Sequence, residues 1–469
     1  MTAHTKPYLD LDPEAERPPE FTDEALALEF ARTHCENLRY VADWGKWLLW
    51  TGDHWRFDDS LQTFNLSRHI CRKASAKALR DLRPRVARKV ASALASGKTV
   101  SAVERLARSD RRLAATVDQW DRDPALLNTP DGVVDLRTGV LHAHDRTDYC
   151  TKITAVAPAA PGTPCPMWTN FLLRVTDGDR YLIAFLQRIA GYALTGFTKE
   201  HALFFAYGTG RNGKGVFTNT LTGIMGAYAA VASMETFTAS STAQHPTDLA
   251  MLRGARLVTA QETEEGRRWA EAKIKALTGG DPITARFMRQ DFFTYQPQFK
   301  LLIAGNHKPA IRGVDEAIRA RFNLIPFKVT IPPEERDRDL FEKLKAEWPA
   351  ILRWAIDGCL AWQQIGLDQP LSVRDATEDY LSQEDSIATW LDECCIRQER
   401  SRENTMDLYA SWMEWAEKNG EVPGSAKRLS QALQSRGFTP KREAETGKMG
   451  FDGIRLKRRN YTDSTRYGG

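Results

Sequence analysis

The chain is poor in the features that would tie it to a disulfide scaffold, a zinc ribbon or a membrane. Its 469 residues include only seven cysteines, which are scattered apart from Cys394–Cys395, and no two have the spacing C-x-x-C. A zinc ribbon or a disulfide framework is therefore not expected. The sequence also shows no signal-peptide pattern and no apolar run of roughly 18 residues. We expect a cytoplasmic protein with reduced thiols and no membrane contact.

An overall excess of one charge sign is missing as well. The net charge is only +4, so any affinity for nucleic acid has to come from local basic patches. One such patch lies between Arg68 and Arg112, where fourteen Lys and Arg accompany three Asp and Glu. A charge run is usually a solvated helix face, whereas so one-sided an excess suits a phosphate-contacting surface. The sequence leaves both interpretations open.

Clustered acids that could hold two metal ions are absent from the first 120 residues. Primer synthesis needs such a cluster, and the pair Asp58–Asp59 falls in an expected turn. We therefore predict that this chain has no primase activity.

The segment from Tyr40 to Phe57 is rich in aromatic residues. Trp44, Trp47, Trp50 and Trp55 surround a turn at Thr51–Asp53, and this pattern predicts a β-hairpin. The four tryptophans could stack nucleic-acid bases, but a small aromatic core is the favoured interpretation. Similar alternation predicts a hairpin within residues 127–141, and a helix is expected to begin after Thr22.

The most informative stretch is a glycine-rich loop between an apolar run at 202–207 and a run with helical spacing at 216–221. A strand, a glycine-rich turn ending in Gly-Lys and a helix form a phosphate-binding loop, in which backbone N–H groups converge on phosphate oxygens. ATP with Mg²⁺ is the expected ligand. The predicted binding residues are Gly208, Thr209, Gly210, Arg211, Asn212, Gly213, Lys214, Gly215 and Val216.

One position departs from this pattern. The Ser or Thr that should follow Lys214 and bind magnesium is Gly215. We expect the metal to rely on phosphate oxygens, water and the region of Glu262, with Thr218 as a weaker candidate.

Polar residues follow three later apolar stretches. A strand expected at 255–262 ends in Glu262, which could hold the magnesium shell or polarise the attacking water. A strand expected at 299–306 ends in Asn306, an amide suited to orient that water or contact the γ-phosphate. Arg319 and Arg321 precede another strand and could reach the nucleotide of a neighbouring subunit.

Together these motifs resemble a superfamily 3 helicase of the poxvirus-type helicase–primase branch, found in the phage and plasmid primase family. The resemblance runs from about residue 120 to 330 and more weakly beyond. It implies an α/β, AAA+-like P-loop ATPase core that forms a homo-hexameric ring and unwinds DNA in a bacterial host cell. Its catalytic residues would be Lys214, Glu262, Asn306 and Arg321, with Arg319 as the alternative arginine finger.

The resemblance also implies where DNA is contacted. The segment 283–300 corresponds to a hairpin that projects into the ring channel, with Arg286, Arg289 and Gln290 as contacts. The stretch 425–457 has the pattern helix, turn, helix and two strands, typical of a winged helix. Its phosphate-contacting candidates are Lys427, Arg428 and Arg436, with Lys441 and Arg442; docking of a protein is the alternative role.

The expected organisation is mixed, with an α+β N-terminal region and a mainly helical, winged-helix-like C-terminal domain. The boundaries are 1–20 (disordered), 21–120 (α+β with basic helices), 121–198 (hairpin and helices), 199–330 (ATPase), 331–395 (helical connector), 396–458 (winged-helix-like) and 459–469 (tail). A primase or polymerase would come from another chain. The rival hypothesis is a DNA-binding initiator or loader for which nucleotide is an assembly switch, a role favoured by Gly215.

Overall fold

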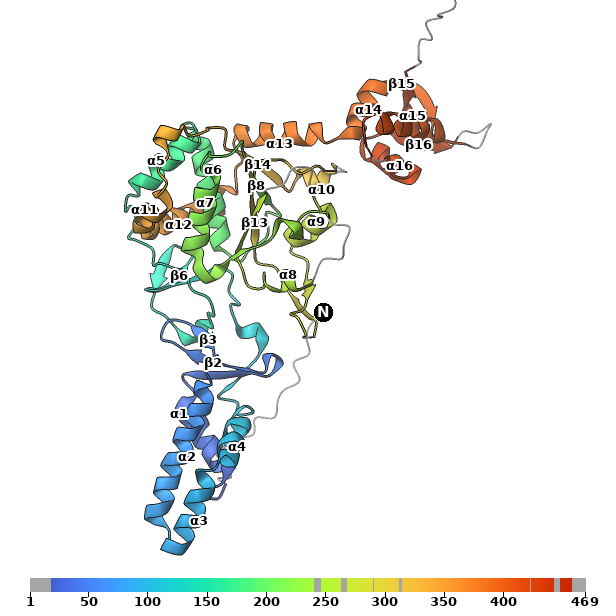
Figure 1. Cartoon of the computed structure of the whole chain (residues 1–469). Helices are drawn as coiled ribbons and strands as arrows, with labels where there is room; N and C mark the ends of the chain where they lie inside the picture. The colour runs from blue at the N-terminus through green and yellow to red at the C-terminus, as the bar shows by residue number, and fades with distance from the viewer. Residues whose placement is uncertain are drawn as a thin grey trace, which may run out of the picture.

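The computed structural model describes residues 18–239, 246–262, 268–289, 291–311, 314–421, 423–442 and 448–457. Figure 1 shows three parts: a helical region built from the first part of the described chain, a central α/β body above it, and a small C-terminal domain to one side of the body. Helix α13 (Leu371–Gln383) connects the last two parts. None of the helices in the described ranges is long and apolar enough to cross a membrane.

The N-terminal region packs four helices against a small sheet. Its helices are α1 (Asp23–His34), α2 (Gln62–Asp81), α3 (Pro84–Leu94) and α4 (Gly97–Ala107). Its sheet has the order β3-β2-β1-β4, with β1 (Leu38–Val41), β2 (Lys46–Trp50), β3 (Trp55–Phe57) and β4 (Ala114–Ala115). The hairpin predicted across Thr51–Asp53 is confirmed by the antiparallel pairing of β2 with β3. Helix α1 begins after Thr22 as predicted, and the Thr22 hydroxyl accepts from the backbone N–H of Ala25 (3.2 Å).

The tryptophans of this region form an aromatic core. Trp47 and Trp55 are buried. The Trp47 indole N–H donates to Glu104 Oε1 (2.5 Å), and that of Trp55 donates to the carbonyl of Arg146 (3.0 Å). Because both rings are enclosed and their polar atoms are satisfied, neither is available to stack a base, so the core interpretation is confirmed for these two residues.

A second antiparallel sheet leads into the central body. It contains β5 (Leu126–Thr129), β6 (Gly132–Asp135) and β7 (Val140–His142), which confirms the hairpin predicted within 127–141. The following helices are α5 (Pro166–Val175) and α6 (Arg180–Leu194), and α6 packs against the later helix α12 (Trp348–Ile365). Their backbones nearly touch, since a Cβ at Gly191 would lie 2.0 Å from the backbone nitrogen of Cys359.

The central body is built on a five-stranded parallel sheet with the order β14-β8-β13-β10-β9. Its strands are β8 (Leu203–Tyr207), β9 (Ala229–Val231), β10 (Leu257–Glu262), β13 (Lys300–Gly305) and β14 (Phe322–Pro326). Every residue of β13 and β14 is buried, as expected for parallel strands covered on both faces. That burial explains why these strands were predictable as continuous apolar runs.

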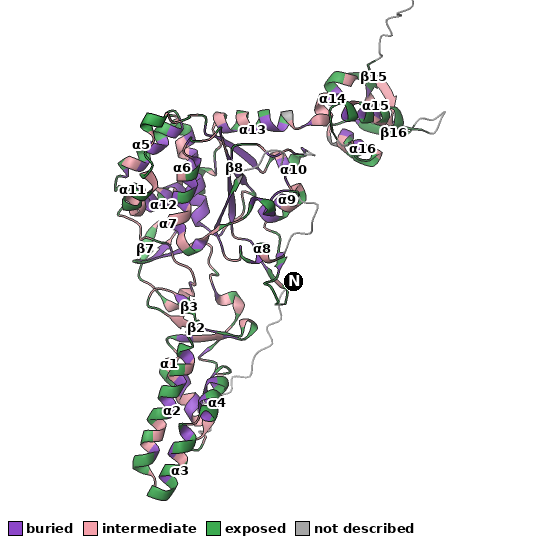
Figure 2. Cartoon of the chain, in the orientation of Figure 1, coloured by how far each residue is buried: buried purple, intermediate pink, exposed green. Residues whose placement is uncertain are grey.

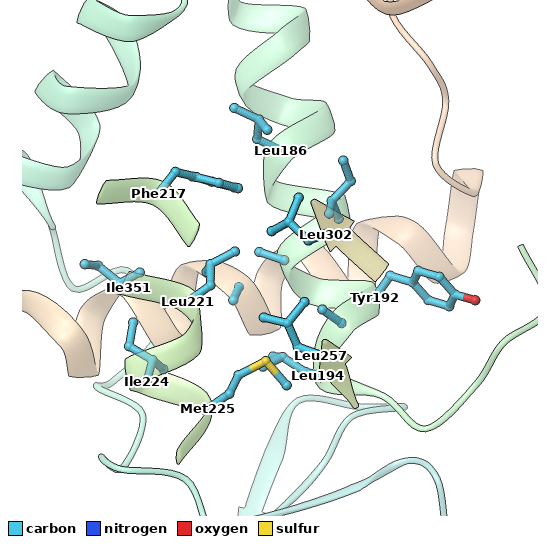
Figure 3. Packing of buried hydrophobic residues seen from close by; sticks show 14 of the residues in the cluster. Leu186, Tyr192, Leu194, Phe217, Leu221, Ile224, Met225, Leu257, Leu302 and Ile351 are labelled. Atoms are coloured by element: carbon cyan, nitrogen blue, oxygen red, sulfur yellow. The ribbon is translucent and has the colours of Figure 1, made fainter. Parts of the chain in front are cut away.

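Helix α7 (Lys214–Met225) lies on one face of this sheet with its apolar side turned inward. Figure 3 shows Phe217 and Leu221 of α7 with Leu257 and Leu302 of the sheet and Ile351 of α12 in a single cluster. A second cluster on the other face includes Trp269 and residues of α9 (Glu271–Gly279). Because the sheet is packed on both faces, α7 is held in a defined position on it, and the loop that precedes α7 is held near the ends of the strands.

The C-terminal domain has its own core of residues such as Trp390, Trp412, Leu429 and Leu433. Its elements are α14 (Ser386–Cys394), β15 (Cys395–Asn404), α15 (Thr405–Lys418), α16 (Ala426–Ser435), β16 (Thr439–Arg442) and β17 (Met449–Leu456), with sheet order β15-β17-β16. The prediction of two helices within 425–457 is wrong. The described part of that stretch holds only α16, because Gly437 (φ +86°) ends it and β16 follows at once. The helix that packs against α16 is the earlier α15.

Candidate functional site

The loop between β8 and α7 is shaped by glycines at positions where a side chain would be strained or would clash. Gly210 and Gly213 have φ of +95° and +87°, a region in which side chains are strained. A Cβ on Gly213 would lie 2.5 Å from Val175, and one on Gly208 would lie 2.2 Å from the carbonyl oxygen of Phe327. The loop therefore turns tightly and ends with its N–H groups at the start of α7, the arrangement that binds anions.

Lys214 is a buried cation at the centre of this loop. Its Nζ donates to the carbonyl of Gly208 (2.7 Å), to Asn212 Oδ1 (3.0 Å) and to Asn306 Oδ1 (3.2 Å). Only 7% of Lys214 is exposed, and burial lowers its pKa from 10.5 to about 8. None of its partners among the described residues carries a negative charge. A buried ammonium without a counter-charge is suited to receive a phosphate anion.

The ends of three neighbouring strands lie in register beside Lys214. Tyr207 at the end of β8 pairs with Gly305 at the end of β13, which pairs with Glu262 at the end of β10. Asn306, which follows β13, is thereby placed between the loop and β10. The structure thus brings Lys214 and Asn306 together, at the carboxyl edge where parallel sheets bind ligands.

Glu262 can be placed only by its backbone. It is the last residue of β10, in the row that contains Gly305 and Tyr207. Its side chain and the neighbouring Glu264 and Glu265 lie outside the described residues, so the predicted metal and catalytic roles of Glu262 stay predictions. Within the described ranges, no group of three His, Cys, Asp or Glu side chains could hold a metal ion.

Asn212 holds the loop to the end of β14. Its Nδ2 donates to the carbonyl of Phe327 (2.8 Å), while its Oδ1 accepts from Lys214. The backbone N–H of Ile331 also donates to the carbonyl of Arg211 (3.1 Å). Sequence reasoning included Asn212 only as a loop residue and missed this tether. The one available signal was the polar side chain inside an otherwise glycine-rich turn.

Thr218 is the candidate for a magnesium-binding hydroxyl near the start of α7. The hydroxyl of Thr218 bonds to the carbonyls of Lys214 (3.1 Å) and Gly215 (3.2 Å) and is buried, so it is committed to the helix backbone. Gly215 is exposed, and a Cβ added there would meet nothing within 4 Å. A serine or threonine side chain would therefore fit at position 215.

Arg319 and Arg321 lie at the opposite end of the strands, where the parallel strands begin. The carbonyl of Arg321 accepts from the backbone N–H of Leu203 (2.7 Å), which is the first residue of β8, whereas Lys214 follows its end. At about 3.3 Å per residue, β8 separates the two edges by roughly 13 Å. The structure thus does not bring either arginine to the loop of its own chain.

The two arginines differ in their partners. Arg319 donates two hydrogen bonds to the carboxylate of Glu378 (2.8 and 2.9 Å) and lies 3.6 Å from Asp385. Arg321 donates to Thr278 Oγ1 (3.2 Å) and to the carbonyl of Ala317 (2.7 Å). Arg321 has no ion-pair partner among the described residues and is therefore the better candidate to meet an external anion.

The predicted DNA-contacting hairpin is present as β11 (Ile283–Ala285) paired with β12 (Phe293–Tyr295). Its tip exposes Arg286, Phe287, Met288, Arg289 and Phe292, and the Arg286 guanidinium lies over the Phe292 ring at 4.8 Å. Gln290 lies outside the described residues. Exposed arginines beside exposed aromatic rings are suited to contact phosphates and bases.

The C-terminal candidates differ in how far they are exposed. Lys427 and Arg428 are exposed on α16. Arg436 instead donates two hydrogen bonds to the buried carboxylate of Asp385 (2.6 and 2.7 Å). Because Arg436 joins α16 to the start of α14, its role inside the chain is structural. Lys441 and Arg442 are exposed on β16.

A cavity of about 380 Å³ lies next to Ala320, the residue between Arg319 and Arg321. Its lining includes Ala202, Asn323 and Arg374, so it opens where β8 and β14 begin, at the edge opposite Lys214. It is not part of the phosphate-binding loop.

Comparison with known proteins places these features in a family context. Residues 26–177 match a domain family described as D5 N terminal like, and residues 206–321 match a family of unknown function (DUF5906). The chain is similar to "Putative helicase L207/L206" of Acanthamoeba polyphaga mimivirus, with 24% identity over 69% of this chain and 36% of that protein. It is also similar to "Putative helicase 022R" of Frog virus 3 (isolate Goorha), with 24% identity over 50% of this chain and 26% of that protein.

The chain thus spans about a third of the length of the curated relatives it matches. Among solved structures, two of the NrS-1 C-terminal region are similar, each with a TM-score of 0.48. Their identities are 10% and 12%, covering 91% and 88% of this chain and 98% and 87% of theirs. Residues 26–177 thus match the D5 N-terminal domain family, and the relatives that match a larger part of the chain are named putative helicases, which supports a family of the helicase–primase type.

Proposed function

We propose that the chain is an ATP-driven, ring-forming DNA helicase of a replication system, with an AAA+-like core of superfamily 3. The observation that carries this proposal is Lys214, a buried ammonium beside Asn306 with no described carboxylate partner. Its position at the first residue of α7 adds the positive end of the helix dipole. The β- and γ-phosphates of ATP have the charge and geometry to satisfy it.

The residues at the carboxyl ends of the strands would each have a separate role in ATP hydrolysis. Lys214 would hold the phosphates, and Glu262 would polarise the attacking water. Asn306 would orient that water once phosphate draws Lys214 away from its amide oxygen. Glu262 is the protein group at this end of the sheet that would hold Mg²⁺, which when bound would neutralise negative charge developing on the phosphates.

A ring is supported by the arginine positions. Because Arg321 lies at the opposite sheet edge from Lys214, it is suited to complete the site of a neighbouring subunit. Its lack of a described carboxylate partner favours it over Arg319. A homo-hexamer is the assembly we propose.

DNA would be contacted at two places. The tip of the β11–β12 hairpin, with Arg286 and Arg289, would line the channel of the ring. The C-terminal domain, which we propose to be winged-helix-like, would use Lys427 and Arg428 on α16 for phosphates.

The test is ATP hydrolysis and strand displacement on forked DNA by the purified full chain. Lys214→Ala should reduce DNA-stimulated hydrolysis by a factor of 100 or more, because the phosphates lose their buried cation. Lys418→Ala is the matched control, since this exposed lysine on α15 pairs with Glu414 far from the loop. Unchanged turnover in Lys214→Ala would refute the assignment.

A second function is favoured by Gly215, which leaves the loop without its usual metal-binding hydroxyl. In that case the chain is a DNA-binding initiator or loader that uses nucleotide as an assembly switch. Robust strand displacement supports the helicase. Binding or melting of DNA without displacement, together with nucleotide-dependent assembly, supports the initiator.

A further inference from the structure

We propose that α2 and α3 form a second DNA-binding surface, outside the ATPase core, that holds the phosphate backbone of duplex DNA. This surface, the basic arm, consists of eight exposed cations on α2, on α3 and in the turn between them. They are Arg68, Arg72, Lys73, Arg80, Arg83, Arg85, Arg88 and Lys89. The proposal goes beyond the function of the loop at Lys214 and does not depend on ATP hydrolysis.

Within the described residues, the cations of the basic arm have no acidic partners. No ion pair joins any of the eight to an acidic side chain in the described parts of the structure. Their neighbour Lys77 differs, because it contacts Glu20 and lies 3.7 Å from Asp81. The two nearby carboxylates are thus directed to Lys77, and the eight exposed cations remain open to an external polyanion.

The segment 68–112, which contains the basic arm, is far more positive than the rest of the chain. Residues 68–112 hold fourteen cations and three anions, a charge of +11, while the whole chain carries +4. The remaining residues therefore sum to −7. Such a concentration of like charge repels itself and destabilises the compact state. A bound polyanion would turn this repulsion into attraction.

The cations lie outside the buried faces of the helices that carry them. Helices α2 and α3 bury the opposite face, with Ile70 and Ala78 on one and Ala87 and Ala91 on the other. The hydroxyl of Ser75 donates to the carbonyl of Ala91 (2.9 Å) and ties the two helices together. The two helices therefore pack together through their buried faces, and Figure 2 shows exposed residues (green) along both α2 and α3.

The chemistry of the arm favours duplex over single-stranded DNA. Proteins that hold single strands stack bases on aromatic rings, and no Trp, Tyr or Phe is exposed on the described α2 and α3. The 20 residues of α2 extend for about 30 Å, which matches roughly nine base pairs of duplex. The arm also lies at the end of the molecule away from the C-terminal domain (Figure 1), so it could hold duplex that the ATPase core has not yet reached.

Two exposed apolar residues near the tip, Leu79 and Val86, point to a competing occupant. They could belong to a contact with another protein or with a second copy of the chain. Because this apolar patch has only two side chains and lies beside eight cations, we propose the DNA phosphate backbone as the ligand of the arm. The copy–copy contact becomes an outcome of the test.

The experiment compares two triple variants of the full chain with the same loss of charge. Arg85→Gln/Arg88→Gln/Lys89→Gln alters the basic arm, and Arg32→Gln/Lys345→Gln/Lys418→Gln alters exposed cations that already pair with acids. Binding of a fluorescent 30-base-pair duplex and of a single strand of equal length is measured by anisotropy without nucleotide, over a range of salt concentrations.

The arm variant should bind the duplex at least tenfold more weakly than the control variant. Its slope of log affinity against log salt should fall by about 2 to 3, because roughly 0.9 is lost for each missing phosphate contact. Affinity for the single strand should change less. Circular dichroism checks that both variants are folded, and Arg68→Gln/Arg72→Gln/Lys73→Gln on α2 provides a second, independent arm variant.

Equal duplex affinity and equal salt slopes in the arm and control variants would overturn the proposal. So would unchanged duplex binding together with a loss of oligomeric mass in light scattering, since the arm would then be a contact between copies. Because no nucleotide is present, these outcomes leave the assignment of Lys214 untouched, and failure of the Lys214 test leaves the basic arm untouched.

Discussion

Lys214 lies at the N-terminus of α7 with its ammonium withdrawn from water, and burial lowers its pKa to about 8. Near pH 8 the nucleotide-free protein is therefore half neutral at this residue. A bound phosphate favours the ammonium and raises the pKa again. Binding should consequently take up a proton, about half of one at pH 8 and nearly a whole one at pH 9. Nucleotide affinity should fall by up to about tenfold per pH unit above pH 8.

Calorimetry in two buffers of different ionisation enthalpy measures this uptake directly between pH 7.5 and 9.5, where the nucleotide phosphates are already ionised. Lys214→Arg is the control, because arginine stays charged throughout. The absence of proton uptake in the wild type would contradict the prediction. In the free protein the sign for stability follows from the same shift. The folded pKa is below the unfolded value of 10.5, so this residue's contribution to the free energy of unfolding rises between about pH 8 and 10.5.

Gly215 offers a second test at the scale of one residue. Because a Cβ there would meet no atom within 4 Å, serine can be introduced without repacking. Gly215→Ser should lower the Mg²⁺ concentration that gives half-maximal nucleotide binding by several-fold, since the hydroxyl is placed where a phosphate-binding loop normally supplies a ligand. Gly215→Ala is the control: it adds the same Cβ without the oxygen. The prediction fails if the Mg²⁺ titrations of the two variants coincide.

At the scale of elements, the central sheet was predictable because its strands are buried on both faces. The apolar runs at 202–207, 255–262 and 299–306 correspond to β8, β10 and β13 within two residues. A continuous apolar run of this kind can be recognised as a buried strand without knowing which strands pair with it. The common edge of Lys214 and Asn306 followed from the parallel arrangement, and their contact of 3.2 Å agrees with it.

Long-range pairings were not predictable in this way. Asn212 reaches Phe327, Arg319 reaches Glu378, and Arg436 reaches Asp385. Each pair joins elements whose packing has no periodic signature in the sequence. The same limit explains the incorrect second helix after 435, because helical propensity in a short stretch gives way to pairing of β16 with β17.

At the scale of the whole molecule, the separation of Arg321 from Lys214 across β8 predicts complementation between inactive subunits. Lys214→Ala removes the phosphate contact but keeps the arginine, and Arg321→Ala does the reverse. Each variant alone should lose ATP hydrolysis. In a ring mixed from equal amounts, one interface in four would join an intact Lys214 to an intact Arg321, so the mixture should recover up to about a quarter of wild-type hydrolysis.

The control for this mixture combines Lys214→Ala with the double variant Lys214→Ala/Arg321→Ala, in which no interface is complete and no recovery is expected. Native mass spectrometry establishes that mixed oligomers have formed. Nucleotide binding by Arg321→Ala alone should be retained, because Arg321 lies at the far sheet edge of its own chain. If mixed oligomers form and hydrolysis does not return, Arg321 does not act across the interface, and its bonds to Thr278 and Ala317 would then define a structural role within α9 and α10 (Glu316–Arg319).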